Sequence, residues 1–419
     1  MLDIKYIREH AAEIKENCKN RNMSVDVDRL LELDEQRRTI LHELETMRAT
    51  RNAGSKKKPS EEEIQQMREV GESIKKLESE FGEIDAEYTE LLHAIPNITH
   101  PDAPVGKEED FVVVYTNKNA PVFDFAPKNH EELLSMNDLA DFERGAKVAG
   151  SKFYFAKNDL VRLNQALLNF AIDTVGEQGY KLLETPDLVK KEILDGSGFN
   201  PRGSESQIYS VQDQDLNLIG TAEISVLGFH ANEILNLSEG PKKYAALSHC
   251  FRTEAGAYGK ESKGLYRVHQ FTKLELFVFC KPEDSEAMHQ ELLDLEKDIC
   301  NALGLCYRVI DIPTGDLGGP AYRKYDLEAW MTMKDEDGGF GEITSTSNCT
   351  DYQARRLNIK YKEAENQEYV HTLNGTAVVL SRFPLSIMEQ FQLSDGSIAI
   401  PEVLVPYMGG RKKINNQRA

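Results

Sequence analysis

Charged side chains alternate along a strand-like run at residues 266–279. Arg267, His269, Phe271, Lys273 and Glu275 are two positions apart, so they fall on one face of an extended chain. The other face carries the residues expected in the core: Val268, Gln270, Thr272, Leu274, Leu276 and Val278. A face that combines cations, an aromatic ring and a carboxylate suits a site for phosphate and ammonium groups.

The preceding strand-like run, residues 244–251, leads into Arg252 and Glu254, which again share a face. A Gly-rich, charged turn joins the two runs. Arginine keeps its charge and binds phosphate oxygens in pairs, which favours an anion site here. Cross-strand ion pairs, such as Arg252 with Glu275, are the structural alternative.

The first hundred residues show helical periodicity. Residues 1–24 predict one short amphipathic helix, with Asp3 as its N-cap. Apolar side chains at a/d spacing then predict two long helices, broken at residues 52–55, interrupted only by Arg37, and ended by Pro96. They are Leu30, Leu33, Ile40, Leu44, Met47, Ile64, Met67, Ile74, Leu77, Phe81, Ile84, Tyr88 and Leu91.

Ser60 and Glu63 form a capping-box pattern at the start of the second long helix. Two such helices joined by a short turn make an antiparallel coiled-coil hairpin, here residues 28–95, with limbs of about 30 residues or roughly 45 Å. The tip, residues 48–58, contains five cations and no acid: Arg48, Arg51, Lys56, Lys57 and Lys58. The cluster is either a solvated turn or a contact for a phosphate backbone.

Beyond the hairpin the pattern changes. Residues 106–118 predict a linker between a helical domain (1–105) and a second domain (119–419). In the second domain strand-like runs (244–251, 268–279, 306–312, 377–380) interleave irregularly with helical ones (160–177, 285–302, 385–391). This predicts an α+β fold built on an antiparallel sheet flanked by helices.

Composition excludes several classes of protein. The 419 residues carry a net charge of −20, so an RNA partner would need a local basic patch. No apolar stretch approaches the roughly 18 residues of a membrane span, and the charged N-terminus does not resemble a secretory signal. Six scattered cysteines (18, 250, 280, 300, 306 and 349) favour neither disulfides nor a zinc site, so we expect a reducing, cytoplasmic location.

The strand pair also resembles motif 2 of the class II aminoacyl-tRNA synthetases, in the form found in seryl-tRNA synthetases: FRTEAG, a charged loop, then RVHQF and a Glu, within residues 244–279. NGTAVVLSRFPLSIMEQFQ (374–392) resembles motif 3, and PDLVKKEILDGSGFNP, within residues 180–201, resembles motif 1. Further blocks resemble the family: TAE (221–223), YDLEAWM (325–331), GEITSTSNCTDYQARR (341–356) and PEVLVPYMGG (401–410).

This resemblance, to the bacterial type of the family, covers nearly the whole chain. It implies a ligase that activates L-serine with ATP and Mg²⁺, forms seryl-adenylate and pyrophosphate, and transfers serine to tRNA(Ser), with tRNA(Sec) as a second candidate. It implies a homodimer formed through motif 1, with Pro186 at the bend, and a tRNA-binding arm with the five tip cations as contacts. No zinc and no membrane partner are expected.

The resemblance also implies roles for single residues. Arg252, Glu254, Arg267 and Arg382 are the expected catalytic residues. The expected ATP site comprises Arg252, Thr253, Glu254, Arg267, Val268, Phe271, Glu342, Ile343, Thr344, Ser345 and Arg382. The expected serine site comprises Thr221, Ala222, Glu223, Arg252, Glu275, Asn374 and Thr376. Glu342 and Ser345 match the family's Mg²⁺ contacts, although strict strand alternation would place them on opposite faces.

Three positions depart from the family pattern: Thr344 and Thr376, where Ser is frequent, and Ser381, where Gly is frequent. None removes an essential group. His269 is expected to be structural rather than a base. Two alternatives stay open: an amino acid ligase of the same superfamily that charges a carrier protein, and a non-catalytic RNA-binding paralogue. The first would lack the long arm, and the second would be expected to lose Arg252, Glu254 or Arg382.

Overall fold

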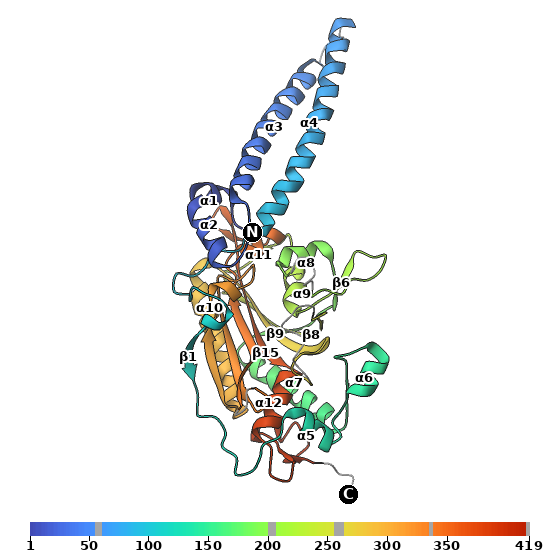
Figure 1. The fold of residues 1–419 in the computed structure, drawn as a ribbon. Coiled ribbons are helices and arrows are strands. Elements are labelled where there is room, and N and C mark those ends of the chain that lie inside the picture. Colours follow the sequence, from blue (N-terminus) through green and yellow to red (C-terminus); the bar gives the residue numbers. More distant parts are fainter. Residues whose placement is uncertain (55–60, 200–206, 255–263, 335–337, 416–419) are drawn as a thin grey trace. The chain divides into compact units, whose positions relative to one another are not determined.

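A computed structural model describes residues 1–54, 61–199, 207–254, 264–334 and 338–415 (Figure 1). The chain forms two compact units, Met1–Ile98 and Thr99–Ala419. The boundary lies a few residues before the one expected from sequence, near 105. None of the helices in the described ranges is long and apolar enough to cross a bilayer. All six cysteines are buried free thiols.

The first unit begins with two short helices, α1 (Ile4–Glu9) and α2 (Ala11–Asn20), where the sequence predicted one. The break is at His10, whose backbone (φ −123°, ψ 31°) leaves the helical region. The His10 ring stacks on Tyr6 at 4.2 Å between centroids, and its Nδ1 lies 3.1 Å from the Tyr6 carbonyl oxygen. Asp3 caps α1 as predicted, accepting from the Lys5 N–H.

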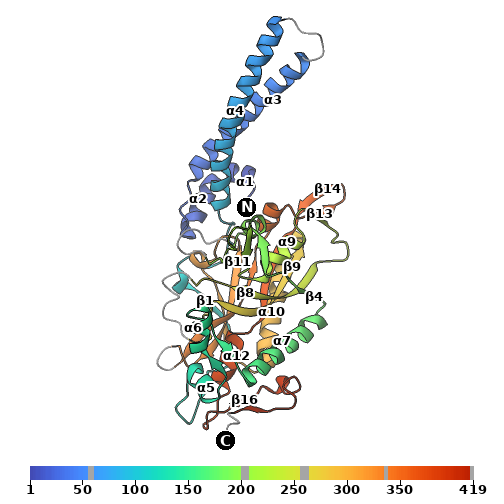
Figure 2. The same cartoon turned by 90° about the vertical axis from the view of Figure 1, so that its right-hand side faces the viewer.

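The coiled-coil hairpin is confirmed: α3 (Val27–Gly54) and α4 (Glu61–Ala94) run side by side in both views (Figures 1 and 2). The predicted a/d residues Leu30, Leu33, Ile40, Leu44 and Ile74 are buried. The predicted break at 52–55 was placed too early, because α3 continues through Gly54, where the last helical turn tolerates poor helix formers. The predicted cap at Ser60 and Glu63 falls outside the described residues and side chains.

Arg37 interrupts the apolar stripe and yet is well accommodated. Its Nε donates to Asp85 at 2.5 Å, and its guanidinium lies over the rings of Tyr88 (4.4 Å) and Phe81 (5.4 Å). An arginine stem can cover apolar surface while its charged end is paired, which explains a cation at this position.

The second unit is an α+β fold around an eight-stranded sheet of order β1-β10-β11-β12-β15-β9-β8-β4. Its strands are β1 (Val112–Thr116), β4 (Lys181–Glu184), β8 (Lys242–Phe251), β9 (Gln270–Cys280), β10 (Tyr307–Asp311), β11 (Arg323–Met331), β12 (Gly339–Asn348) and β15 (His371–Val379). Smaller sheets contain β2 (Ala140–Asp141), β3 (Phe155–Ala156), β5 (Leu188–Lys190), β6 (Leu216–Leu218), β7 (Ile234–Leu235), β13 (Lys360–Glu363), β14 (Asn366–Tyr369), β16 (Ile398–Ala399) and β17 (Lys413–Ile414).

Helices cover both faces of this sheet. They are α5 (His130–Met136), α6 (Phe142–Ala149), α7 (Asp159–Glu177), α8 (Lys191–Ser197), α9 (Ala222–Phe229), α10 (Ser285–Ala302), α11 (Tyr352–Leu357) and α12 (Arg382–Gln390). On β9, Leu274, Leu276 and Val278 join the core formed with α7, α10 and α12, as the alternation predicted. Phe277 and Phe279 point the other way, into a second core with α9 and α11.

The structure refines the sequence-based expectations for this unit. The segment 106–118, predicted to be a linker, contains β1, an edge strand of the large sheet. Its backbone hydrogen bonds with β10 form despite the acidic residues that precede the strand. The predicted α+β fold on an antiparallel sheet is confirmed, with one parallel pair, β4 with β8, at its edge. The short strand predicted at 377–380 is the end of β15, which begins at His371.

Two β-bulges change the direction of side chains near the middle of the sheet. On β12, Glu342 pairs with Glu328 but Thr344 pairs with Leu327, so Ile343 is the extra residue. On β15, Thr376 pairs with Glu275 but Val378 pairs with Leu274, so Ala377 is the extra residue. After each bulge, the side chains lie on the opposite face of the sheet from the one that strict alternation would give them.

Candidate active site

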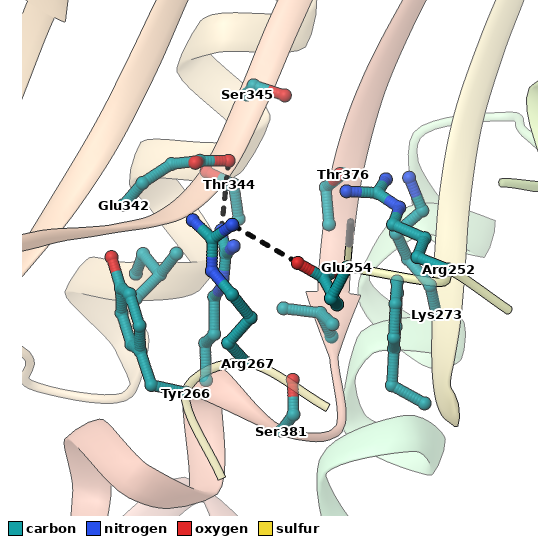
Figure 3. Close-up of a pocket in the computed structure, with 14 residues that line it drawn as sticks. Arg252, Glu254, Tyr266, Arg267, Lys273, Glu342, Thr344, Ser345, Thr376 and Ser381 are labelled. Atoms are coloured by element: carbon teal, nitrogen blue, oxygen red, sulfur yellow. Dashed lines mark hydrogen bonds and ion pairs between the residues drawn. The ribbon is translucent and has the colours of Figure 1, made fainter. Parts of the chain in front are cut away.

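A pocket opens where β9, β12, β15 and the start of α12 meet (Figure 3). It encloses about 490 Å³, open solvent included. Ten residues expected in the ATP and serine sites line it: Arg252, Glu254, Arg267, Phe271, Glu342, Ile343, Thr344, Ser345, Thr376 and Arg382. Tyr266, Lys273, Val379 and Ser381 complete the lining. Residues from distant parts of the chain therefore converge on one pocket.

Three arginines supply positive charge to this pocket. Arg382, at the first position of α12, pairs with Glu342 at 2.9 Å and lies over the Tyr266 ring at 5.1 Å. Arg267 pairs with Glu254 at 3.1 Å (Figure 3). Although burial opposes ionisation, Glu342 keeps the pKa of Arg382 above its ordinary value. The cations are thus fixed and charged before any anion arrives, which is the preorganisation that phosphate binding requires.

Arg252 lies at the end of β8, where its Nε donates to the Gly220 carbonyl at 3.2 Å. Its guanidinium lies 5.4 Å from the centre of the Phe271 ring and 5.8 Å from that of Phe199. The structural alternative was an ion pair between Arg252 and Glu275. The Glu275 carboxylate instead pairs with Lys273 on its own strand.

Glu342 and Ser345 face the same pocket, which contradicts strict strand alternation. Cross-strand partners share a face, and these two residues pair with Glu328 and Asp326 on one face of β11. The bulge at Ile343 therefore puts the Glu342 and Ser345 side chains on the same face of the sheet. Arg382, Lys324 and Arg252 outweigh burial and lower the pKa of Glu342, so it is ionised at neutral pH. An ionised carboxylate and a hydroxyl fit Mg²⁺, which prefers oxygen ligands and keeps several waters.

The residues expected in the serine site form a polar cluster that continues from the pocket. Thr376 lies 3.4 Å from Glu275, oxygen to oxygen, and Asn374 donates to Glu223 at 3.2 Å. Thr221 is 3% exposed, and in the described part of the chain its hydroxyl has no hydrogen-bond partner. A buried hydroxyl of this kind is available to a ligand.

Glu223 has the most informative ionisation in the cluster. Burial and the nearby Glu275 carboxylate raise its pKa to about 7, against a hydrogen bond from Gln353 that lowers it. Gln353 donates to Glu223 at 2.6 Å and to the Ser197 carbonyl at 2.9 Å, and it accepts from Thr372 at 2.7 Å. Without a ligand, Glu223 is therefore about half ionised near pH 7. A bound ammonium group would stabilise its charged form.

Some expected site residues have their side chains elsewhere. Ala222 is fully buried in the core with α11, and Val268 is 3% exposed. The Thr253 N–H donates to the Gln207 carbonyl at 3.1 Å. Ala222 and Val268 therefore have only their backbone to offer a ligand. The His269 Nδ1 lies 2.8 Å from the Arg252 carbonyl oxygen, and the ring stacks on Phe153 at 5.2 Å.

At the hairpin tip, Arg48 and Arg51 are exposed, and Arg48 pairs with Glu78 at 2.7 Å. Lys56, Lys57 and Lys58, the other expected tRNA contacts, lie outside the described residues.

Sequence reasoning missed two residues that support the site. Gln353 lies in a recognised block, but no local signal connects it with Glu223. Glu296 has a signal: it is a charged residue among Leu292, Leu293, Leu295 and Ile299 on the buried face of α10. Charged residues are rarely buried without a partner, so the position of Glu296 on the apolar face indicates a polar contact in the interior.

Comparison with known proteins agrees with this geometry. Residues 1–99 match the family model "Seryl-tRNA synthetase N-terminal domain", and residues 208–391 match "tRNA synthetase class II core domain (G, H, P, S and T)". A serine–tRNA ligase from Treponema denticola is 50% identical over 98% of this chain and 99% of its own. The chain belongs to the seryl-tRNA synthetase family.

Solved seryl-tRNA synthetases have the same fold. The enzyme from Pyrococcus horikoshii, complexed with ATP, is 39% identical with a TM-score of 0.89 and covers 99% of this chain and 100% of its own. The cytoplasmic serine–tRNA ligase from Naegleria fowleri, in complex with AMP, is 35% identical with a TM-score of 0.86, covering 100% and 99%. The family resemblance stated from motifs is thus confirmed along the whole chain.

Proposed function

We propose that this seryl-tRNA synthetase family member activates L-serine with ATP and transfers it to the 3′ end of tRNA(Ser), with tRNA(Sec) as a second acceptor. The observation that carries the proposal is the convergence of Arg252 and Arg382 on one pocket that reaches Glu275 through Thr376. Such a pocket holds nucleotide and amino acid together. Family membership supports the same reaction.

Activation joins two anions, so positioning and charge neutralisation are the main tasks. A serine carboxylate oxygen attacks the α-phosphorus, and the bond from that phosphorus to pyrophosphate breaks. Arg252 is proposed to hold the α-phosphate, Arg382 the γ-phosphate, and Arg267 the bent triphosphate. Phe271 would stack on the adenine, with Glu254 near its amino group. Phe271 already carries Arg252 over its ring, which supports a shared role.

Mg²⁺ would be held by Glu342 and Ser345 and would neutralise phosphate charge. Glu342 is the suitable carboxylate because its pKa is lowered, whereas burial raises the pKa of the neighbouring Asp326.

Serine selection would use the polar cluster. Glu275, Glu223 and Thr221 are proposed to bind the ammonium, and Asn374 and Thr376 the hydroxyl. A pocket whose buried polar groups expect a hydroxyl rejects alanine and glycine because they leave those groups unpaired. Threonine would be excluded by size, and the methyl group of Thr376 narrows the space.

The hairpin tip is proposed to contact tRNA through Arg48, Arg51 and the three lysines that follow. RNA helices are recognised largely through shape and backbone, which suits a basic tip on a long narrow arm. A homodimer through the motif 1 region is supported by exposed apolar side chains on β4, β5 and α9: Leu182 (52%), Leu188 (40%) and Phe229 (59%). The six free thiols suit a reducing cytoplasm.

Two assays test the proposal. ATP–pyrophosphate exchange with serine, threonine, alanine and glycine should proceed with serine alone at low concentration. Charging of transcribed tRNA(Ser) should then require the arm. Exchange that serine does not stimulate would refute the proposal, and exchange without charging would favour a ligase with a different acceptor.

Replacing the five tip cations by Ala should spare exchange and reduce charging severely. The matched control replaces Lys5 and Lys19, exposed on the short helices α1 and α2 and not on the hairpin, and should charge normally. Equal loss in both assays would contradict a role confined to tRNA binding.

A further inference from the structure

A buried carboxyl group lies directly behind the proposed active site. Glu296 on α10 is fully buried, and α10 packs against β15 and β12 (Figure 1). The helix covers the face of the sheet that carries Leu274 and Leu276, opposite the face with Lys273 and Thr376 that lines the pocket. Its Oε1 accepts from the Thr376 backbone N–H at 2.8 Å. Its Oε2 accepts from the Thr344 hydroxyl at 2.7 Å. One carboxyl group therefore connects a helix to two strands that line the pocket.

The two strands separate where this carboxyl group sits. β12 and β15 pair at Asn348–Leu373, Ser347–Asn374 and Thr346–Gly375, and the ladder ends there. The next residues, Thr376 on β15 and Ser345 on β12, line the pocket. A buried N–H without a partner costs free energy comparable to a lost hydrogen bond, so the separated strands need another acceptor. Glu296 supplies it to Thr376.

Both β-bulges lie beside the same carboxyl group. Thr344 is the second residue of the β12 bulge, which directs Glu342 and Ser345 into the pocket. Thr376 directly precedes the β15 bulge at Ala377, after which Val379 also faces the pocket. The hydrogen bonds of Glu296 thus hold the two irregular positions that give the pocket its side chains.

Gly375 permits this approach. A Cβ at that position would lie 2.9 Å from Glu296 Oε1, so any larger residue would push the carboxyl group away. The close fit, full burial and two satisfied oxygens distinguish this contact from incidental helix packing.

From these contacts we infer that Glu296 is a positioning residue: it keeps β12 and β15 apart and fixes Thr376 on the serine side and the Glu342–Ser345 pair on the ATP side. The inference rests on the proposed serine activation. Burial raises the pKa of Glu296 well above its usual range, which favours the protonated carboxyl group. Glutamine keeps the acceptor for the Thr376 N–H, and its NH2 group can donate to the Thr344 hydroxyl oxygen, so it is the closest substitute for Glu296.

The test compares Glu296→Gln, Glu296→Leu and the control Asp298→Leu, an exposed residue of the same helix. Serine and threonine kinetics are measured by ATP–pyrophosphate exchange, and folding by thermal unfolding. Glu296→Leu should lose about 10- to 100-fold in kcat/KM for serine, because small displacements of positioning groups have effects of this size. The ratio of serine to threonine should fall as well. Glu296→Gln should remain within about threefold of wild type, and Asp298→Leu should be unchanged.

Glu296→Asp covers the case in which the leucine variant does not fold. Its shorter side chain keeps a carboxyl group but cannot reach both strands, so it should show the same kinetic loss. Folded leucine or aspartate variants with wild-type kinetics and selectivity would overturn the inference. So would lowered stability with no change in KM or in the serine-to-threonine ratio. A wild-type enzyme without serine-dependent exchange would instead refute the proposed function.

Discussion

Replacing Glu223 by glutamine tests the electrostatics of the proposed serine pocket. The substitution keeps the shape and the hydrogen bond from Gln353, and it removes only the charge. A pKa of about 7 against an ordinary 4.5 means that ionised Glu223 costs about 3 kcal/mol in the empty pocket. The serine ammonium would relieve this cost through a charge-assisted hydrogen bond worth about 1.5–3 kcal/mol. The KM for serine should therefore rise about 10- to 150-fold in Glu223→Gln.

The pH profile separates this explanation from a simple loss of packing. In the wild type, kcat/KM for serine in the exchange assay should rise with pH until about 7 and then level off, because only the ionised carboxylate pairs with an ammonium. Glu223→Gln should lack this rise across the same range. Glu291→Gln is the matched control, since Glu291 binds Lys243 at 2.8 Å, apart from the pocket lining, and should retain the wild-type profile.

Stability gives an independent measurement. The folded-state pKa of Glu223 is raised, so its favourable contribution is complete below about pH 4.5 and is lost as pH rises through about 7. Glu223→Gln should therefore unfold at a higher temperature than wild type above pH 7. A variant that keeps the pH-dependent rise in kcat/KM, or has an unchanged KM, would refute the reasoning.

Three further substitutions probe other parts of the structure. Gln353→Leu removes the hydrogen bond that lowers the pKa of Glu223, so the midpoint of the serine profile should move to higher pH; an unmoved midpoint would contradict this role. Arg37→Ala removes an ion pair and two ring contacts, and should lower the local stability of α3 by about 1 kcal/mol, measured by amide hydrogen exchange in the full chain; unchanged exchange would show that the contacts contribute nothing. Gly264→Ala places a Cβ against His130 Nε2 at a φ of +64°, and should raise the KM for ATP about tenfold by displacing Tyr266 and Arg267, which line the pocket; a normal KM would mean that residues 264–267 adapt to the substitution.

Alternation along the second strand of the site was predictable because side-chain direction in an extended chain is a local property. The separate faces of Glu275 and Leu274 follow from period two alone, and β9 has them as expected. The hairpin of α3 and α4 followed in the same way from heptad spacing. The order of the motifs indicated the family, and the family resemblance indicated the residues that converge on the pocket.

Only the tertiary structure decided how those residues share a site. The bulges at Ile343 and Ala377 leave no mark in composition, yet they put Glu342 and Ser345 on one face and turn Val379 toward the pocket. The pKa of Glu223 depends on Glu275 and Gln353, which are 52 and 130 positions away in the chain.

Glu296 shows the difference most directly. In the sequence it is one of several acidic residues in an amphipathic helix. In the fold its two oxygens meet partners 48 and 80 residues distant. Local periodicity determines which way a side chain points along its own element. The pairing of strands, and the polar groups that separation of those strands leaves unsatisfied, depend on contacts between elements that no local pattern encodes.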